Sequence, residues 1–493
     1  MSDAVHSFHA VVIGAGSGGL TVAVGLARLG RQVALVEADA VGGDCTNVGC
    51  IPSKTLIELA GRVSSLPVAE RRAAAEAALA ETRARRDALR AHEERWLSEM
   101  PNLTLVRGRA TLEHGDRATP TVLVRSAHGD ETRLAAPRVV LATGARAVVP
   151  DVPGLTDAVG GDGATLTNAT VFDLRSPPAR MAVLGAGAIG CELAFAFARL
   201  GSSVTLVELA DRVLPASEAA ASSVVHARLE RLGVEVLTDT TARSYHADTG
   251  RLVVAHAPKG TPPRERSLDG IDRILVAVGR RPAADGLGLD EVGVRRDGRG
   301  AVIVDGAYRT TRAGVYAIGD LIGGAFTHVA NHHGRRLVRS LTLPLPLAPA
   351  RDYPSVAFTE PEVGQIGPTL AELRRRWPDA LLAVHGVDLA TTDRGRTSGL
   401  QDGFVQLVAM RLTGRLLAAT VVAPQASEML PLLAWAQRRR VSLWQLSRQV
   451  VAYPALGDAV RQAADAFVFS SLPRLHHELA TYLRWRWRRG ARL

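Results

Sequence analysis

Two cysteines in one short segment are the residues best suited to do chemistry in this chain. Cys45 and Cys50 stand in GGDCTNVGCIPSK, residues 42–54, and four residues separate them. A pair at this spacing can close a small ring as a disulfide and open again on reduction. Three cysteines in 493 residues do not make a structural disulfide framework, so a redox role explains the pair better. We interpret the third cysteine, Cys191, as a small packed residue.

The residues after Cys50 favour an activated thiol. The PSK of residues 52–54 suits a helix near its start, where the helix dipole lowers the pKa of a thiol. Lys54 and Lys259 are the only lysines in a chain that otherwise uses arginine. A lysine at position 54, where the chain would otherwise use arginine, indicates that a compact point charge is needed four residues past Cys50. Glu192, which follows the third cysteine, is the candidate partner of Lys54 in a buried ion pair.

One strand, glycine turn, helix and strand occurs twice in the chain. VVIGAGSGGL begins at residue 11 and leads through GLARLG into VALVE, and AVLGAGAIG begins at residue 182 and leads through AFARLG into VTLVE. Three glycines and the final acid match at an offset of 171, namely Gly14, Gly16, Gly19 and Glu37 against Gly185, Gly187, Gly190 and Glu208. Each copy predicts a helix that begins at the glycine turn between two strands.

Both copies have the parts that hold a dinucleotide. Glycines allow the tight turn and the close approach of a pyrophosphate, the helix N-terminus faces the phosphates, and the acid binds ribose hydroxyls. A single GxGxxG is weak evidence, but both copies also place an acid 23 residues beyond the first glycine. We therefore expect two bound dinucleotides rather than glycines that only pack a helix onto a sheet.

Length and composition indicate a globular protein of about three domains. Hydrophobic residues make up 47% and charged residues 22%, which excludes a disordered or fibrous chain. The net charge of +10 is scattered apart from the last dozen residues, so we expect no nucleic-acid partner. The cysteines lack zinc-site spacing, so we expect no metal site. No apolar run approaches the roughly 18 residues of a membrane span, and no secretory signal begins the chain, so we expect a cytoplasmic protein.

The cysteine segment and the two dinucleotide motifs together resemble the pyridine nucleotide-disulfide oxidoreductases, in the branch of dihydrolipoamide dehydrogenase and mercuric reductase. The resemblance runs from Val11 to about Phe469 and includes three further segments: VVLATG at 139–144, VGRRP at 278–282 and VYAIGD at 315–320. It implies an α/β fold with two Rossmann-like three-layer domains, which bind FAD and NAD, and a C-terminal α+β dimerisation domain. It also implies a homodimer.

The resemblance divides the chain into parts. Residues 1–150 and 280–345 would form a discontinuous FAD-binding domain, 151–279 the NAD(P)-binding domain and 350–470 the dimerisation domain. A proline-rich stretch at 343–349 marks a linker before the last of these, and residues 471–493 remain as a basic aromatic tail.

Roles for individual residues follow from the same resemblance. Hydride would pass from the nicotinamide to the flavin and then to the disulfide, with Cys50 as the flavin-side thiol in a charge-transfer contact and Cys45 as the exchange thiol. Lys54 and Glu192 match the family's pair beside the flavin ring, and Asp320 matches the acid that holds the ribityl chain. The residues expected to bind the cofactors are Gly14, Gly16, Gly19, Glu37, Gly43, Lys54, Ala110, Thr143, Gly144, Gly185, Gly187, Gly190, Glu208, Gly279 and Asp320.

The choice of nicotinamide nucleotide depends on the acid of the second motif. Glu208 should bond a free ribose 2′-hydroxyl and repel a 2′-phosphate, which favours NAD(H). Arg212 lies near enough in the sequence to leave NADP(H) open as an alternative.

The C-terminal segment departs from the family pattern. Disulfide-exchanging members carry HPTxxE, whose histidine, oriented by the glutamate, serves the partner subunit's exchange thiol as acid and base. Tyr453 and Asp458 stand at these two positions here. An unperturbed tyrosine has a pKa near 10, against about 6.5 for histidine, so Tyr453 is a poor base at neutral pH. His328, His332 and His333 are candidate substitutes, although structural roles explain them better.

Mercuric reductases also carry a tyrosine at that position, but they end in a cysteine pair that hands over Hg(II), and this chain has no cysteine after Cys191. The acceptor therefore stays open among a small disulfide, a metal ion and a quinone. The alternatives are a metal-ion reductase, a quinone reductase that works directly from the flavin, and a slow redox sensor at a membrane.

The tail extends beyond the resemblance. RWRWRR at 484–489 follows Leu472, Leu475, Leu479 and Leu483 at helical spacing. Such a helix could lie weakly on an anionic membrane surface, while a solvated or subunit-packing helix is the simpler interpretation.

Overall fold

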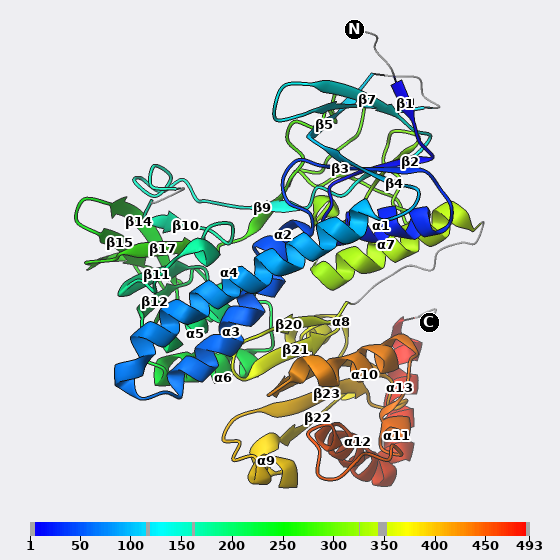
Figure 1. The fold of residues 1–493 in the computed structure, drawn as a ribbon. Helices are drawn as coiled ribbons and strands as arrows, with labels where there is room; N and C mark the ends of the chain where they lie inside the picture. Colours follow the sequence, from blue (N-terminus) through cyan, green and yellow to red (C-terminus); the bar gives the residue numbers. More distant parts are fainter. Residues whose placement is uncertain (1–4, 115–118, 160–162, 325, 344–352, 490–493) are drawn as a thin grey trace.

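The computed structural model describes residues 5–114, 119–159, 163–324, 326–343 and 353–489. Three units, each built on its own five-stranded sheet, are visible in Figure 1. The predicted linker at 343–349 lies almost wholly outside the described residues. No helix in the described part of the chain is long and apolar enough to cross a membrane.

The first unit has a parallel sheet that lies between helices and a second, smaller sheet. The parallel sheet has the order β19-β8-β2-β3-β4, and the smaller one has the order β1-β7-β6-β5. The strands are β1 Val5–Ser7, β2 Ala10–Ile13, β3 Val33–Glu37, β4 Leu103–Arg107, β5 Arg109–Glu113, β6 Thr121–Arg125, β7 Glu131–Ala135, β8 Val139–Leu141 and β19 Val315–Ala317. The helices are α1 Ser17–Arg28 and α7 Thr327–Thr342.

Successive side chains of β2 point to opposite faces of the parallel sheet, and each face is covered by another layer. Ala10 and Val12 pack in the cluster with α1 and α7, while Val11 and Ile13 face the cluster with the small sheet. Both sets are buried because the strand is covered on its two faces, which is typical of a parallel sheet.

The second unit repeats this plan. Its parallel sheet has the order β10-β17-β11-β12-β13 and an antiparallel sheet β14-β15-β16 lies beside it. The strands are β10 Thr165–Leu166, β11 Arg180–Leu184, β12 Ser203–Val207, β13 Glu235–Leu237, β14 Thr240–His246, β15 Arg251–His256, β16 Arg264–Leu268 and β17 Arg273–Val276. Helices α5 Ala188–Arg199 and α6 Ala219–Arg231 belong to this unit, and β9 Ala145–Ala147 pairs with β18 Arg280–Pro282 where the chain crosses between the units.

The third unit is an antiparallel sheet in the order β20-β21-β24-β23-β22. Its strands are β20 Ser355–Ala357, β21 Glu362–Ile366, β22 Leu382–Asp388, β23 Phe404–Met410 and β24 Leu416–Ala423. Its helices are α8 Leu370–Arg376, α9 Asp393–Thr397, α10 Ala426–Arg438, α11 Leu443–Leu446, α12 Asp458–Ser471 and α13 Leu475–Arg489. One face of the sheet packs on α10, α11 and α12. On the other face, Val363 of β21 and Val422 of β24 lie opposite each other and join the core of the second unit.

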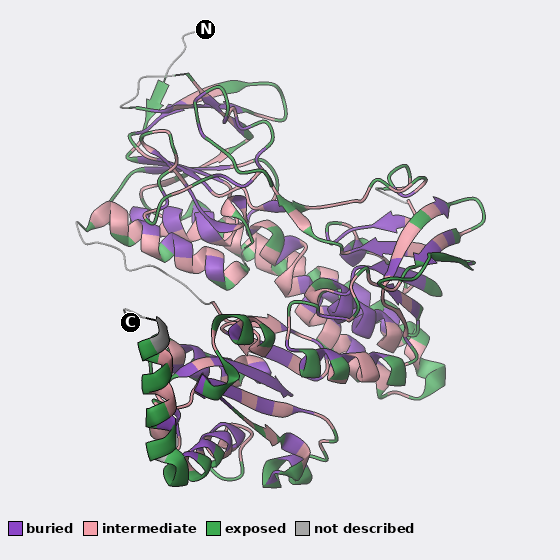
Figure 2. Cartoon of the chain, turned by 180° about the vertical axis from the view of Figure 1, so that it is seen from behind, coloured by how far each residue is buried: buried purple, intermediate pink, exposed green. Residues whose placement is uncertain are grey.

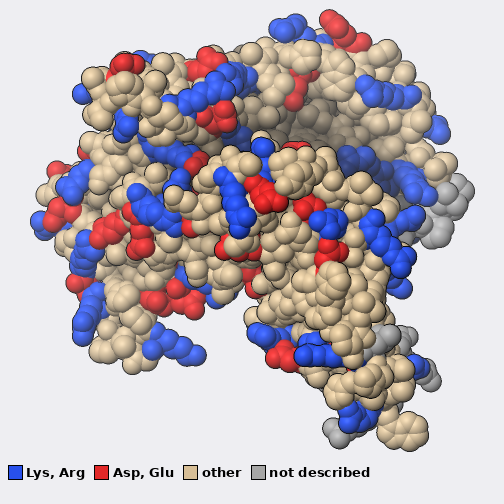
Figure 3. All heavy atoms as spheres, turned by 90° about the horizontal axis from the view of Figure 1, so that it is seen from below, with Lys and Arg blue, Asp and Glu red and all other residues tan. Residues whose placement is uncertain are grey.

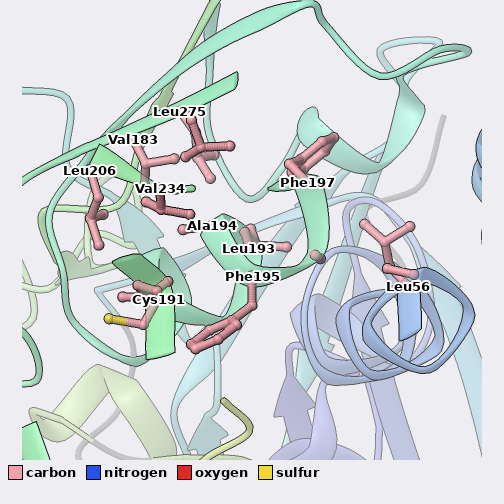
Figure 4. Packing of buried hydrophobic residues seen from close by; sticks show 14 of the residues in the cluster. Leu56, Val183, Cys191, Leu193, Ala194, Phe195, Phe197, Leu206, Val234 and Leu275 are labelled. Atoms are coloured by element: carbon pink, nitrogen blue, oxygen red, sulfur yellow. The ribbon is translucent and has the colours of Figure 1, made fainter. Parts of the chain in front are cut away.

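Three helices lie between the first and second units and tie them together, and the first two of these helices carry Cys45 and Cys50. They are α2 Gly43–Asn47, α3 Cys50–Ser64 and α4 Val68–Ser98. Leu56 of α3 and Phe195 of α5 lie in one buried cluster, which Figure 4 shows from close by. The longest of the three helices is α4, and Figure 2 shows its surface as partly exposed.

The observed architecture confirms the expected fold class of two three-layer α/β units followed by an α+β unit. Short 3-10 helices complete the chain at Val171–Asp173, Gly319–Ile322, Asp379–Leu381, Leu389–Thr391 and Leu472–Arg474. Basic and acidic side chains are interspersed over the face in Figure 3, in agreement with a scattered charge.

Candidate active site

The first glycine turn forms a cradle beside a large cavity. Gly14 has φ of 102°, and a Cβ there would lie 2.5 Å from the Ala142 carbonyl oxygen, so only glycine fits this turn. Glu37 accepts hydrogen bonds from the backbone N–H of Ala15 at 2.6 Å and of Asp39 at 2.8 Å, which hold its carboxylate at the end of β3. The cavity of about 970 Å³ begins here.

Most of the residues expected in the first site line this cavity. They are Gly14, Gly16, Glu37, Gly43, Ala110, Thr143, Gly144 and Asp320. Gly19 instead packs α1 onto the turn, since a Cβ there would meet the Gly14 carbonyl oxygen at 1.9 Å. A Cβ on Gly43 would lie 2.7 Å from Gly16 Cα, so only glycine lets these two backbone segments lie together at the wall of the cavity.

The second turn reproduces the first in detail. Gly185 has φ of 97°, and Glu208 accepts from the N–H of Ala186 at 2.5 Å and of Ala210 at 2.8 Å. Gly190 packs against the Gly185 carbonyl as Gly19 does in the first unit. Gly185, Gly187, Glu208 and Gly279 line a second cavity of about 950 Å³. The repeated sequence has therefore produced two equivalent cradles.

The two cavities meet at the cysteine segment. Cys45, Arg280, Asp320 and Thr327 line both cavities, and Cys50 lines the second. The residues present fit a dinucleotide in each cavity, because both cavities combine a glycine cradle at a helix N-terminus with a fixed acid for ribose hydroxyls.

The cysteines occupy the starts of two helices and are both free thiols. Cys50 is the first residue of α3, so Pro52 lies near the start of this helix, as the sequence indicated. The pKa of Cys50 is lowered to about 6 by hydrogen bonding from Cys45, with help from Thr327 and from the charge of Lys54, against the opposing effect of burial. The pKa of Cys45 is raised by its hydrogen bond to Cys50 and by burial. The reduced pair therefore holds its negative charge on Cys50 and its proton on Cys45.

Thr327 is a site residue that the sequence alone did not identify. It begins α7, and its Oγ1 lies 3.3 Å from Cys50 Sγ. A helix N-terminus and a hydroxyl donor at this distance both stabilise a thiolate. The only signal in the sequence is its position just after the GD motif at Gly319 and Asp320.

Lys54 and Glu192 form the ion pair that the sequence predicted. Lys54 Nζ lies 2.8 Å from Glu192 Oε2, and the side chains are 32% and 5% exposed. The other carboxylate oxygen accepts the Phe358 N–H at 2.9 Å, and Lys54 lies over the Phe358 ring at 4.3 Å. The pair thus joins α3, which lies between the first two units, to α5 of the second unit and to the segment after β20 in the third.

Arg280 is a second residue that sequence reasoning missed. It forms an ion pair with Asp44, donates to the Ala145 carbonyl at 2.7 Å, and lies 3.8 Å from Asp320. The guanidinium therefore fixes the residue before Cys45 to the flavin-side acid expected at Asp320. The VGRRP segment marked its position but not this contact.

Cys191 does not take part in the site. It is fully buried, its thiol donates to the Ala186 carbonyl at 3.3 Å, and burial raises its pKa. Figure 4 shows it among hydrophobic side chains of α5 and the neighbouring strands, as the sequence indicated.

Tyr453 and Asp458 are not arranged as the family's histidine and glutamate would suggest. Tyr453 is 76% exposed and donates its hydroxyl to Asp393 Oδ2 at 3.0 Å. Asp458 accepts from Arg461 at 2.7 Å and from Gln462 at 2.8 Å, so the expected orienting acid is engaged on its own helix. The acid that orients Tyr453 is Asp393, at the start of α9.

Two of the three histidines of α7 are wholly or partly buried, and the third lines the second cavity. His333 is buried against Tyr308, at 5.0 Å between ring centroids, and burial lowers its pKa to about 4. Burial also lowers the pKa of His332. His328 lines the second cavity and lies 2.7 Å from the Pro354 carbonyl. Two of the candidate substitutes are thus packing residues.

Comparisons with known proteins cover nearly the whole chain. Residues 8–334 match the model for the pyridine nucleotide-disulphide oxidoreductases, and residues 353–464 match their dimerisation domain, which supports a homodimer. A dihydrolipoyl dehydrogenase of Haloferax volcanii is 31% identical over 462 residues, which are 92% of this chain and 95% of that protein. A mercuric reductase of Acidithiobacillus ferrooxidans is 32% identical over 474 residues, which are 93% and 82% of the two chains.

Solved structures agree with these relatives. The Cu(II) complex of RclA, a HOCl-induced flavoprotein disulfide reductase of Escherichia coli, superposes with a TM-score of 0.82 at 25% identity and covers 94% of this chain and 100% of that one. LpdA of Mycobacterium tuberculosis superposes with a TM-score of 0.82 at 26% identity, covering 94% and 99%. Two glycine cradles, a thiol pair where their cavities meet, and matches along the chain together lead to one conclusion. The chain belongs to the pyridine nucleotide-disulphide oxidoreductase family and is an FAD-dependent NAD(P)H:disulfide oxidoreductase.

Proposed function

We propose that this enzyme takes electrons from NADH and delivers them through the Cys45–Cys50 pair to a small acceptor. The observation that carries the proposal is the position of the cysteines where the two cavities meet. Bound FAD supplies a group that accepts hydride from the nicotinamide and releases two electrons to a disulfide. The chain contributes the cradles that hold both nucleotides and the thiols that receive the electrons.

Glu208 is the basis for proposing NADH over NADPH. Its carboxylate is fixed by two backbone N–H groups in the second cavity, where it can bond ribose hydroxyls and would repel a 2′-phosphate. Arg212, the candidate for binding that phosphate, donates to the Pro215 carbonyl at 3.0 Å instead.

The two thiols divide the disulfide exchange between them. Reduction of the enzyme disulfide by two electrons and one proton leaves a thiolate on Cys50 and a thiol on Cys45, as the opposite pKa shifts favour. Cys45 sulfur attacks one sulfur of a disulfide acceptor, and its proton leaves with the first thiol released. The Cys50 thiolate then attacks Cys45 sulfur, which closes the enzyme disulfide and releases the second sulfur as a thiolate that takes its proton from water.

We also propose that the enzyme works in the cytoplasm. Its three cysteines do not make the structural disulfide framework that is typical of secreted proteins. We further propose that the FAD-binding, NAD(P)-binding and dimerisation domains have the boundaries predicted above.

Substitution of each cysteine tests the proposal. NADH oxidation with lipoamide as acceptor should be lost in both Cys45→Ser and Cys50→Ser. Only Cys50→Ser should remove the long-wavelength absorbance that a thiolate gives beside bound flavin. Cys191→Ser, at the buried third cysteine, serves as the matched control. Full lipoamide activity in Cys45→Ser would contradict the thiol pathway and favour direct transfer from flavin to a quinone.

A soft metal ion is the second candidate acceptor. Dithiol exchange in the family uses an imidazole base at the position of Tyr453. The tyrosine hydroxyl donates a hydrogen bond to Asp393 and does not supply such a base. A metal ion needs thiolate ligands rather than a proton acceptor, and a mercuric reductase and a Cu(II)-complexed reductase are among the similar proteins. Two Cu(II) ions would each take one electron from the reduced pair, or one Hg(II) ion would take both. Faster Cys45-dependent NADH oxidation with Cu(II) or Hg(II) than with lipoamide would select this candidate.

A further inference from the structure

We propose that one side of the C-terminal helix docks the enzyme on an anionic membrane surface. This side, called here the outer face, consists of Leu472, in the 3-10 helix just before α13, and of Leu479, Leu483 and Trp487 of α13. Their exposed fractions are 56%, 47%, 53% and 90%. Figure 2 shows α13 as a largely exposed helix at the edge of the third unit.

The opposite side of α13 is packed, which fixes the direction of the outer face. Trp485 lies 5.4 Å from Trp377, between ring centroids, and Tyr482 lies 6.0 Å from Trp485. Glu478 is 5% exposed on the same inner side. The helix is therefore held against the end of α8 with its apolar outer face turned to the surroundings.

The charges around the outer face are mostly positive, and the exposed acid Asp379, in the 3-10 helix that packs on α13, is paired with Arg374. Arg474, Arg484 and Arg486 are exposed, and the one acid between Leu475 and Arg489 is the buried Glu478. Arg375 and Arg376 are exposed at the end of α8, directly before Trp377. An apolar row with an exposed tryptophan and flanking guanidinium groups is the pattern of a helix that lies in the interface of an anionic bilayer.

Two other occupants fit less well. A second copy of the same face would bring like-charged guanidinium groups against one another, which costs free energy. A nucleic acid would meet the arginines but offers no apolar medium for the leucine row. An anionic lipid surface satisfies both the charges and the apolar side chains.

Vesicle sedimentation of the FAD-loaded full-length protein tests the proposal. We expect it to sediment with equimolar phosphatidylglycerol and phosphatidylcholine vesicles but not with phosphatidylcholine alone. Trp487→Glu should lower the partition coefficient by about tenfold or more, and Arg484→Gln by about fivefold. Val68→Glu is the matched control, because Val68 is 78% exposed on α4, away from the outer face. Its binding should equal that of the wild type.

Three outcomes would overturn the proposal. Equal sedimentation of wild type and Trp487→Glu would remove the outer face from binding. Equal binding to both vesicle types would show that the guanidinium groups do not select an anionic surface. A loss of dimer mass in Trp487→Glu, measured by light scattering without vesicles, would make the outer face a subunit contact instead. None of these readouts depends on NADH oxidation, so they are independent of the proposed electron pathway.

Discussion

Tyr453 is oriented by Asp393, which lies 60 positions earlier in the chain, across a hydrogen bond of 3.0 Å. The residue expected from the sequence to orient it, Asp458, is engaged by Arg461 and Gln462. The hydrogen bond to Asp393 raises the pKa of Tyr453, because the carboxylate stabilises the protonated phenol. The phenol is thus held in its neutral form by this hydrogen bond.

Replacing Tyr453 by histidine should raise lipoamide turnover. An imidazole with a pKa near 6.5 can carry the proton of the exchange thiol at neutral pH, and general acid–base catalysis of this kind is worth about 100-fold or more. The measurement is NADH oxidation with lipoamide as acceptor. Tyr453→Phe is the control, since it keeps the ring without a titratable group and should give no gain. A Tyr453→His variant no faster than wild type would mean that proton transfer does not limit the reaction.

Replacing Thr327 by valine should raise the pKa of Cys50. The wild-type thiolate, with a pKa of about 6, should be present at neutral pH and lost as the pH falls through that value. Without the hydroxyl at 3.3 Å, the loss should occur at higher pH. The long-wavelength absorbance of the reduced holoenzyme, titrated from about pH 5 to about pH 9, reports this directly. Thr327→Ser should titrate like the wild type, and an identical midpoint in the valine variant would contradict the assigned contact.

Replacing Glu192 by glutamine should destabilise the enzyme. The change leaves Lys54 without its partner and turns an amide donor toward it, at a cost of about 1–3 kcal/mol in the free energy of unfolding. We expect the lower part of this range, because solvent screens the side chain of Lys54, which is 32% exposed. Urea unfolding of the holoenzyme measures the effect. The exposed pair of Arg62 and Glu58 provides the control, and Glu58→Gln should change stability by at most about 0.5 kcal/mol. Equal effects of the two substitutions would show that the Lys54–Glu192 pair contributes no more than a surface pair.

Replacing Glu208 by glutamine should shift the enzyme toward NADPH. The amide can still accept the Ala186 N–H, while the charge that repels a 2′-phosphate is removed. We expect the NADPH-to-NADH ratio of kcat/KM to rise by about tenfold, which corresponds to about 1.4 kcal/mol. Arg212→Gln is the control and should leave the ratio unchanged, because Arg212 is turned to the Pro215 carbonyl. A lower ratio in that control would show that Arg212 already binds the phosphate.

The parts of the site that lie in contiguous sequence could be predicted. A glycine turn between a strand and a helix dictates its own backbone geometry, so each of the two motifs indicated a cradle that the structure contains at Gly14 and Gly185. The spacing of Cys45 and Cys50 likewise identified the thiol pair. The rarity of lysine, together with the family resemblance, identified the ion pair between Lys54 and Glu192 across 138 positions.

The contacts that adjust this chemistry were decided by the tertiary structure. Thr327 reaches Cys50 across 277 positions, Arg280 reaches Asp44 across 236, and Asp393 takes the place that Asp458 was expected to fill. No local pattern encodes them, because each depends on how the sheets and the helices that cover them pack against one another. The sequence by itself determined which groups could do the chemistry, and only the packing of the three units decided which neighbours hold their charges and protons.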